Sequence, residues 1–200
     1  MTERESILQN SWKNFSDRQQ GDRKTDRYVL QQDSNRPVRF FLAKEFNSHP
    51  NGKILDVGSG LYSETYLPKE RDIHLLDWIP HIVNMKNSHV CNAKSLPFED
   101  KAFGIVLSKE VYGCLLNPEE CLDEMIRVLE PDGLLVLIDW EANLKEGDIR
   151  VKIFDSKKVA DQIKSKGFEI IKSVRLIDRT EIEENAYLTA IVARKKTENF

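Results

Sequence analysis

The sequence predicts one α/β domain of the Rossmann-like, doubly wound type, with a mostly parallel seven-stranded sheet and an antiparallel C-terminal strand. Three features carry this prediction. From Gly52 onwards, short apolar runs alternate with helical or loop segments, which is typical of parallel strands joined by crossovers. A glycine-rich turn follows the first run. The last two runs are joined by a polar stretch without helical periodicity, which favours an antiparallel hairpin.

The expected strands are seven short runs rich in Val, Ile, Leu and Phe. Strands that are buried on both faces read as continuous apolar runs, and most of these do. The third run is the weakest of the set. The runs are residues 53–57, 73–76, 89–91, 103–108, 134–139, 168–176 and 187–194.

Three helices are expected around this sheet. The first follows a cap at Ser34 or Asn35 and has Pro37 in its first turn. The second begins after Asn117, which we expect to cap it, and is closed by the Asp132-Gly133 pair. The third begins near residue 155 and stops at residue 167, a glycine. Each carries an apolar stripe on one face.

Composition excludes several classes of protein. The formal net charge is −3 with charged residues nearly balanced, so we expect no nucleic-acid partner. The cysteines Cys91, Cys114 and Cys121 form no C-x-x-C pair and the four histidines are scattered, so no metal site is expected. The polar N-terminus and the lack of an 18-residue apolar stretch favour a cytoplasmic location without membrane association.

The strongest local signal is KILDVGSG at residues 53–60, a strand that runs into a glycine-rich turn. Glycines at this place let a ligand approach the backbone, and a following helix would present unpaired N–H groups. About 21 residues after Asp56 comes Asp77, at the end of IHLLD, where a carboxylate can accept hydrogen bonds from ribose hydroxyls. Gly58, Gly60 and Asp77 together therefore predict a nucleotide-like ligand. Taken singly, the glycines could form an ordinary tight turn, and Asp77 could cap a helix.

Four ordered motifs extend this signal over residues 53–140: ILDVGSG, LLDW, LPFEDKAFGIVLSKEV and NPEECLDEMIRVLEPDG. Together they resemble the class I S-adenosylmethionine-dependent methyltransferases of the small-molecule type, with its LPF-x-D and RVL-x-P-G-G patterns. The resemblance implies S-adenosylmethionine as cofactor and a sheet whose last strand is inserted antiparallel. Residues 1–36 are rich in Arg, Asp, Gln and Ser, which predicts an N-terminal arm or cap, and residues 37–200 are expected to form the methyltransferase domain.

The resemblance assigns one group of residues to the methionine and ribose parts of the cofactor. Asp56 resembles the acidic residue near the methionine amino group. Gly58, Ser59 and Gly60 resemble the turn beneath the cofactor, and Asp77 resembles the carboxylate that holds the ribose.

A second group of residues is assigned to the adenine and to the far end of the methionine. Trp78 would lie against the adenine ring, and Asn92 and Ala93 would face its edge. Ser108 and Lys109, at the end of the fourth expected strand, would border the methionine part. Trp78 could instead be an ordinary packing residue.

The sequence departs from the family pattern at several positions. Tyr62 stands where a third glycine is usual, Asn92 and Gly104 where aspartates are usual, and Asp132 where a glycine is usual. Cys114 stands where many relatives carry a histidine, which weakens the case for a histidine base. Tyr62 is the departure expected to alter cofactor affinity most.

A methyl group on a sulfonium is already activated, so a dedicated catalytic base is optional. The catalytic residues are therefore not assigned, and the candidates lie at the carboxyl edge of the sheet. Glu110 and Tyr112 follow the fourth expected strand, and Asp139, Trp140 and Glu141 follow the fifth. Glu110 could equally serve as a helix cap or in a salt bridge.

The sequence thus predicts a methyltransferase that acts on an oxygen or nitrogen of a small or carrier-linked molecule. The main alternative is a non-catalytic protein that binds S-adenosylmethionine or S-adenosylhomocysteine as a regulatory or assembly subunit. A nicotinamide-dependent oxidoreductase is disfavoured because no x-x-G follows Gly60. Few residues separate the fifth strand from the next helix, so cover for the site is expected from the N-terminal arm.

Overall fold

A computed structural model describes residues 35–49, 51–80, 85–143, 152–179 and 186–195, together with the single positions 13 and 150. The predicted arm at residues 1–36 lies almost entirely outside the described residues. The elements within them are α3 (Arg36–Asn47), β1 (Ile54–Val57), the 3-10 helix η1 (Ser63–Thr65), β2 (Ile73–Asp77), β3 (Ser88–Val90), β4 (Phe103–Lys109), the 3-10 helix η3 (Tyr112–Cys114), α4 (Pro118–Arg127), β5 (Leu129–Glu141), α5 (Ser156–Ser165), β6 (Phe168–Asp178) and β7 (Tyr187–Lys195).

The described strands form one seven-stranded sheet with the order β3-β2-β1-β4-β5-β7-β6. β1 pairs in parallel with β2 and β4, and β4 pairs in parallel with β5. β7 is antiparallel to both β5 and β6, between which it lies. The predicted fold class is confirmed, including the C-terminal hairpin and the antiparallel insertion of the last strand.

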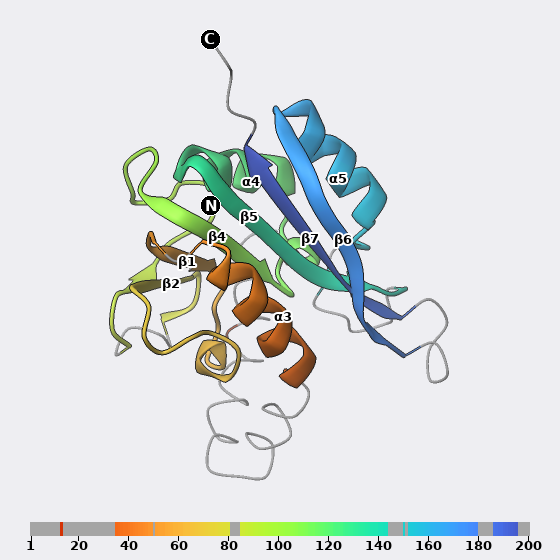
Figure 1. The fold of residues 1–200 in the computed structure, drawn as a ribbon, viewed down its shortest axis with the longest axis horizontal. Helices are drawn as coiled ribbons and strands as arrows, with labels where there is room; N and C mark the ends of the chain where they lie inside the picture. Colours follow the sequence, from red (N-terminus) through yellow and green to blue (C-terminus); the bar gives the residue numbers. More distant parts are fainter. Residues whose placement is uncertain are drawn as a thin grey trace.

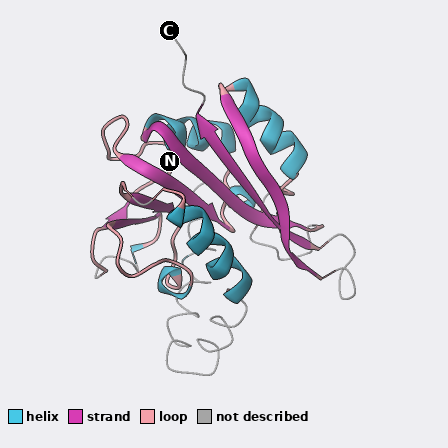
Figure 2. Cartoon of the chain, viewed as in Figure 1, coloured by secondary structure: helices cyan, strands magenta, loops and turns pink. Residues whose placement is uncertain are grey.

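Helices lie on both faces of the sheet, with α3 on one side and α4 and α5 on the other (Figures 1 and 2). Side chains of β4 alternate between the two layers. Ile105 and Leu107 pack with Val38 and Leu42 of α3, and Val106 belongs to the core beneath α4 and α5. The sheet is therefore doubly wound, and its central strands are buried on both faces.

Predicted strand bounds agree with the structure to within two residues, except at the start of β5, which begins at residue 129 instead of 134. The prediction that Asp132 and Gly133 close α4 was wrong, because the helix ends at Arg127. Leu129 pairs with Phe103 of β4, whose N–H donates to the Val128 carbonyl at 3.0 Å. Strand pairing therefore takes over directly where the helix stops.

The predicted side-chain caps at Asn35 and Asn117 were also wrong, while Ser34, the alternative cap of the first helix, lies outside the described residues. Neither Asn35 before α3 nor Asn117 before α4 makes a capping hydrogen bond through its side chain. Asn35 is buried and its amide instead donates to Thr65 Oγ1 at 2.7 Å. α5 is capped by Asp155, which accepts a hydrogen bond from the Lys158 N–H.

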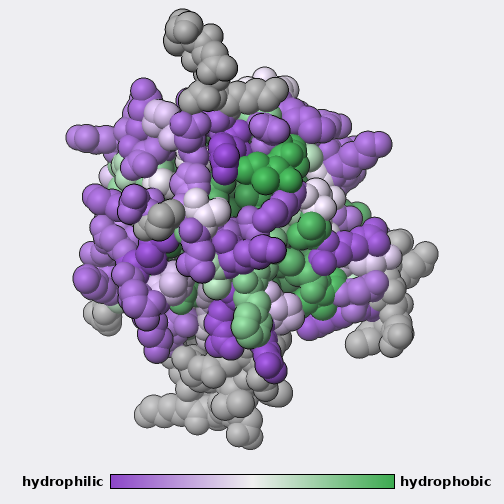
Figure 3. Space-filling view, in the orientation of Figure 1, coloured by the Kyte–Doolittle hydropathy of each residue, from purple (hydrophilic) through white to green (hydrophobic). Residues whose placement is uncertain are grey.

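The face of the molecule in Figure 3 is mostly hydrophilic, with apolar surface along the course of β6. β6 is an edge strand, and its Ile171 and Val174 are partly exposed. Among the described helices, none is long and apolar enough to cross a membrane.

Candidate functional site

The glycine-rich turn after β1 has the backbone that only glycine adopts freely. Gly58 and Gly60 have φ angles of +77° and +56°. A Cβ on Gly58 would lie 2.2 Å from a methyl carbon of Val111, so this glycine is also required by close packing. The N–H groups of Gly58 and Ser59 both donate to the Leu76 carbonyl, at 2.7 and 2.9 Å. The turn is thereby fastened to β2.

Asp77 lies beside this turn, as the sequence predicted. Its carboxylate accepts hydrogen bonds from the Gly60 N–H at 2.8 Å and from the Ile79 N–H at 3.0 Å. A carboxylate has about four lone-pair positions, so it can accept further hydrogen bonds. The structure thus brings Gly58, Gly60 and Asp77 together at the carboxyl ends of β1 and β2.

An α-helix was expected after the glycine turn, and that expectation was wrong. The described chain forms only the 3-10 helix η1 there. Tyr66 and Leu67 directly after it are buried against the α3 face of the sheet, so packing holds the segment in place of a longer helix. No α-helix N-terminus is therefore described at this turn.

Asp56, the last acidic residue before the turn, is fully buried. One of its oxygens accepts a hydrogen bond from the Tyr66 hydroxyl at 2.8 Å. Burial is the main cause that raises the pKa of Asp56 to about 6, against the lowering effect of that hydrogen bond. Burial, and next the nearby Asp56 charge, raise the pKa of Tyr66 well above its usual value.

Three buried side-chain atoms near the carboxyl ends of β1 and β4 have no hydrogen-bond partner among the described residues. They are Asp56 Oδ1, Ser59 Oγ and Ser108 Oγ. Ser108 lies opposite Val57 in the register of these neighbouring strands. Buried polar atoms are rarely left unpaired, so this group fits a polar ligand at this edge, as a methionine moiety would be.

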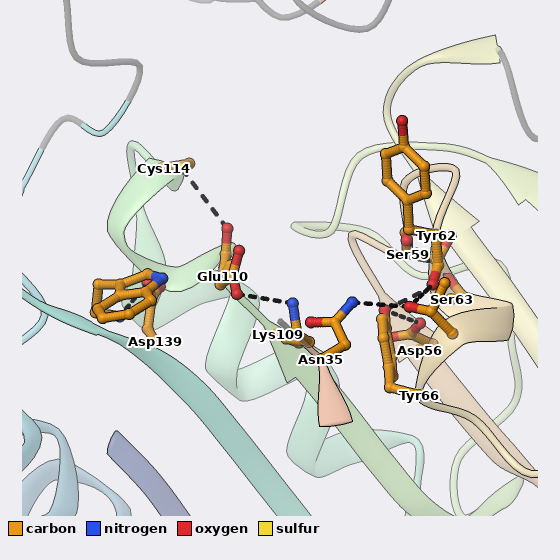
Figure 4. Close-up of polar contacts among 12 residues, drawn as sticks. Asn35, Asp56, Ser59, Tyr62, Ser63, Tyr66, Lys109, Glu110, Cys114 and Asp139 are labelled. Carbon is orange, nitrogen blue, oxygen red and sulfur yellow. Dashed lines mark hydrogen bonds and ion pairs between the residues drawn. The ribbon is translucent and has the colours of Figure 1, made fainter. Parts of the chain in front are cut away.

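An ion pair between Lys109 and Glu110 lies next to Asp56, and a salt bridge was one of the alternative roles expected for Glu110 (Figure 4). Lys109 Nζ is 2.7 Å from Glu110 Oε1 and 5.1 Å from the centre of the Tyr66 ring. Neighbouring residues on a strand normally point to opposite faces. Here Glu110 has a φ of +58°, so the chain turns at the end of β4, where the two side chains meet. Only the carboxylate partner is substantially exposed.

Two of the other candidates after β4 and β5, Tyr112 and Asp139, have structural partners. The Tyr112 hydroxyl donates to Gln162 Oε1 at 3.1 Å, and its buried ring packs against Phe154. Asp139 accepts hydrogen bonds from the N–H groups of Gly113 and Trp140, at 2.9 and 2.7 Å. Burial raises the pKa of Asp139 to about 6. Asp139 therefore ties η3 to β5.

The residues assigned to the adenine lie around the ends of β2 and β3. Trp78 is half-buried after β2, and Ala93 is buried after β3. The Cys91 N–H donates to the Asp77 carbonyl at 3.1 Å, which places the start of the following loop beside the ribose candidate. Asn92 Oδ1 accepts from the Lys94 N–H at 3.0 Å.

Two departures from the family pattern have structural explanations. A Cβ on Gly104 would lie 3.2 Å from both the Asn51 carbonyl oxygen and the Gly52 Cα, so a larger residue would crowd the turn before β1. Asp132 has a φ of +59°, a conformation that glycine favours and that aspartate tolerates better than most residues. Tyr62 has a φ of −115° and needs no glycine. In Figure 4 its ring extends away from Asp56 and Tyr66.

Comparisons with known proteins agree with this geometry. Residues 55–137 match a family model described as a methyltransferase domain. A phthiotriol/phenolphthiotriol dimycocerosates methyltransferase of Mycobacterium tuberculosis is 31% identical over 97 residues, which cover 44% of this chain and 36% of that protein. A demethylmenaquinone methyltransferase of Renibacterium salmoninarum is 27% identical over 121 residues, which cover 56% of this chain and 51% of that protein. The chain thus spans about half or less of these curated relatives.

Solved structures share the fold at low sequence identity. The 1,6-didemethyltoxoflavin-N1-methyltransferase of Burkholderia thailandensis, solved with its substrate and S-adenosylhomocysteine, has a TM-score of 0.70 and 16% identity and covers 98% of this chain and 91% of its own. The [4+2]-cyclase SpnF has a TM-score of 0.61 and 16% identity, covering 74% of this chain and 76% of its own.

Proposed function

We propose that this chain, whose residues 55–137 match a methyltransferase-domain family model, is a class I S-adenosylmethionine-dependent methyltransferase that transfers a methyl group to an oxygen or nitrogen atom of a small or carrier-linked acceptor. The observation that carries the proposal is that the glycine turn at Gly58 and Gly60 is hydrogen-bonded to Asp77. Buried oxygens without a described hydrogen-bond partner lie beside it, on Asp56, Ser59 and Ser108. A turn that admits close approach, a ribose acceptor and unpaired buried oxygens are what this cofactor requires.

S-adenosylmethionine, when bound, supplies the activated methyl group. The residues of this chain would then bind and orient it. Asp77 would hold the ribose, Asp56 would lie near the methionine amino group, and Ser59 and Ser108 would use their unpaired hydroxyls on the methionine part. At the other end, Trp78 would cover the adenine and the loop after β3 would meet its edge.

Glu110 is the candidate for removing a proton from the acceptor. Its side chain is 36% exposed while its partner Lys109 is 5% exposed, so the carboxylate is the accessible member of the pair. Tyr112 and Asp139 already serve internal contacts. The methyl-accepting substrate must lose a proton from its hydroxyl or ammonium group. A carboxylate takes up this proton most readily when that group is acidic. We therefore assign proton removal to Glu110 and a structural role to Tyr112.

The acceptor class draws support from the names of the relatives. The two curated methyltransferases are named for a phthiotriol or phenolphthiotriol dimycocerosate and for demethylmenaquinone. The solved toxoflavin enzyme is named for a nitrogen atom of a small heterocycle. None of these names includes a nucleic acid. We propose a non-polymeric acceptor, a cytoplasmic location, and cover of the site by residues 1–36.

A titration of S-adenosylhomocysteine by calorimetry, with S-adenosylmethionine and NAD in parallel, tests the proposal. We expect binding of the first two and none of NAD. Asp77→Ala should weaken S-adenosylhomocysteine binding by about 1–3 kcal/mol, because ribose hydrogen bonds to a charged acceptor are lost. Asp161→Ala, at an exposed position of α5, is the matched control. Unchanged affinity in Asp77→Ala would remove Asp77 from the site.

A second candidate is a protein that binds the cofactor or its demethylated product without methyl transfer. The fold is shared with a [4+2]-cyclase, so this architecture alone does not imply methylation. Cofactor binding with no methylated product from any of a broad panel of phenols, hydroxy acids and amines would favour this candidate.

A further inference from the structure

The loop between β3 and β4 carries the proposed adenine contacts and is hydrogen-bonded to α4. It spans residues 91–102 and begins with Asn92 and Ala93, which would face the adenine. Its middle contains the LPFED segment at residues 96–100. The position of this loop therefore decides where those two residues stand.

Two residues of α4 hold the middle of the loop through its backbone. Glu124 Oε2 accepts a hydrogen bond from the Leu96 N–H at 2.7 Å. Arg127 donates to the Leu96 carbonyl at 3.1 Å and to the Phe98 carbonyl at 2.8 Å. Both backbone groups of Leu96 are thus bonded to this pair, which we name the Glu124–Arg127 clamp.

The clamp is itself preorganised. Arg127 Nε and Nη2 donate to the two oxygens of Glu124 at 2.7 and 2.8 Å, a two-pronged pairing between residues one helical turn apart. The hydrogen bond from Arg127 lowers the pKa of Glu124. Asp100 in the loop adds a third carboxylate contact to the guanidinium, at 2.8 Å.

The opposite side of the loop is held by aromatic packing. The Phe98 ring meets the rings of Phe103 and His89 edge-on, at centroid distances of 4.8 and 4.7 Å. The Phe98 ring therefore packs against β3 and β4, and the Phe98 carbonyl accepts a hydrogen bond from α4. The loop has one anchor on each side.

The clamp lies close in sequence to the proposed adenine contacts. Asn92 accepts hydrogen bonds from the Lys94 N–H through its side chain and from the Ser95 N–H through its carbonyl, both at 3.0 Å. Leu96 follows directly. A compact turn thus joins the clamped peptide to Asn92, and a shift of Leu96 would move Asn92 with it.

We propose that the Glu124–Arg127 clamp is a specificity-determining support for the adenine base, acting by fixing the Leu96 peptide so that Asn92 and Ala93 face the adenine edge. The inference rests on the proposed function. Neither clamp residue belongs to the proposed cofactor contacts, and both bond the backbone of the loop, so we class both as positioning residues. The proposal also gives a physical reason why the LPF-x-D and R-V-L segments occur in one chain: the arginine of the second segment bonds the backbone of the first.

Calorimetry with two ligands tests this proposal. S-adenosylhomocysteine is compared with S-inosylhomocysteine, in which the 6-amino donor becomes a carbonyl acceptor and N1 carries a hydrogen. We expect the unaltered protein to prefer the adenine ligand by about tenfold or more. Arg127→Met should bring this ratio towards one and weaken S-adenosylhomocysteine binding by about tenfold. Arg127→Lys, which keeps the charge but not the two-pronged geometry, should fall between them.

Matched variants keep the test decisive. Arg175→Met removes an exposed arginine that stacks on Tyr187 of β7, and it should leave both affinities unchanged. Glu124→Gln replaces Arg127→Met if that variant does not fold. A merely structural loss would weaken both ligands by the same factor and keep their ratio.

The two possible failures are distinguishable. If the unaltered protein binds neither ligand, the proposed function fails. If it binds S-adenosylhomocysteine but does not prefer it, or if folded Arg127→Met or Glu124→Gln keeps the full preference, the clamp proposal is overturned.

Discussion

The two halves of the sheet are built differently. β1, β2 and β3 have 4, 5 and 3 residues, and the described part of their connections contains no α-helix. β4, β5, β6 and β7 have 7, 13, 11 and 9 residues, and α4 and α5 cover them. We call these the short-strand half and the long-strand half.

Most of the proposed cofactor contacts lie in the short-strand half. Gly58 follows β1, Asp77 is the last residue of β2 and Asn92 follows β3. The positions assigned to the other half are Ser108 and Lys109 in β4. Short strands with irregular connections leave backbone and side-chain groups available to a ligand, but they bury less apolar surface. The difference indicates that the long-strand half supplies most of the stability and the short-strand half most of the binding.

The largest expected effects are losses of stability and of cofactor affinity after one leucine substitution in each half, and they test how stability and binding are divided between the halves. Leu135→Ala in β5 and Leu76→Ala in β2 remove fully buried leucines from the same core cluster. Each should lower the free energy of unfolding by about 2–5 kcal/mol, measured by urea denaturation, because a cavity remains. Only Leu76→Ala should also weaken S-adenosylhomocysteine binding, because the cavity lets the backbone of residue 76 shift, and its carbonyl accepts the hydrogen bonds that hold the glycine turn. Equal loss of affinity in both variants would break the comparison.

Alanine substitutions at two glycines test how tightly the short-strand half is packed around the turn. Gly58→Ala should destabilise the protein by roughly 3 kcal/mol, because it adds a clash with Val111 to the strain of a left-handed backbone. Gly60→Ala meets no atom within 4 Å and should cost only about 1 kcal/mol. The double variant Gly58→Ala/Val111→Ala should recover part of the larger loss. Thermal and urea unfolding would measure all three, and a similar cost at both glycines would contradict the packing argument.

A pH dependence of stability is also expected, and each half contributes one carboxyl group to it. Burial raises the pKa of Asp56 and of Asp139 from 3.8 to about 6. The folded protein therefore holds these protons at pH values where the unfolded chain has lost them. The free energy of unfolding should consequently fall as the pH rises from about 4 to about 6, by on the order of 2 kcal/mol for each group.

Asparagine variants separate the two contributions. Asp56→Asn and Asp139→Asn should each remove one part of this slope in urea titrations between pH 4 and 7, and the control Asp161→Asn should remove none. Bound S-adenosylhomocysteine should reduce the Asp56 part alone, because its ammonium group would lie near that carboxylate. A slope unaffected by both variants would show that other groups carry the pH dependence.

The sequence was sufficient to predict the strands and the placement of the glycine turn. Buried parallel strands such as β4 read as uninterrupted apolar runs, and a turn that needs positive φ at Gly58 and Gly60 is written as glycine. Asp77 was predictable because it follows its strand at a fixed distance from the turn. These features are local, so neighbouring residues determine them.

Features that depend on distant partners were not predictable. The caps expected at Asn35 and Asn117 were wrong because capping competes with tertiary contacts, such as the hydrogen bond from Asn35 to Thr65. The end of α4 was misplaced because Leu129 pairs with Phe103, which no helical pattern reveals. The contact of Lys109 with Tyr66 likewise joins residues far apart in the sequence.

The insertion of β7 between β5 and β6 has a consequence for the order in which the chain assembles. β6 precedes β7 in the sequence, but its neighbour in the sheet is β7 and not β5. As the chain emerges from a ribosome, β6 therefore has no place in the sheet until the last strand has also been synthesised. The final step of folding must then join residues 134–141 to residues 187–194 across nearly fifty intervening positions, which is a slow kind of contact to form. During that interval the apolar edge of β5 is uncovered, and this is the stage at which a nascent chain would most need a chaperone.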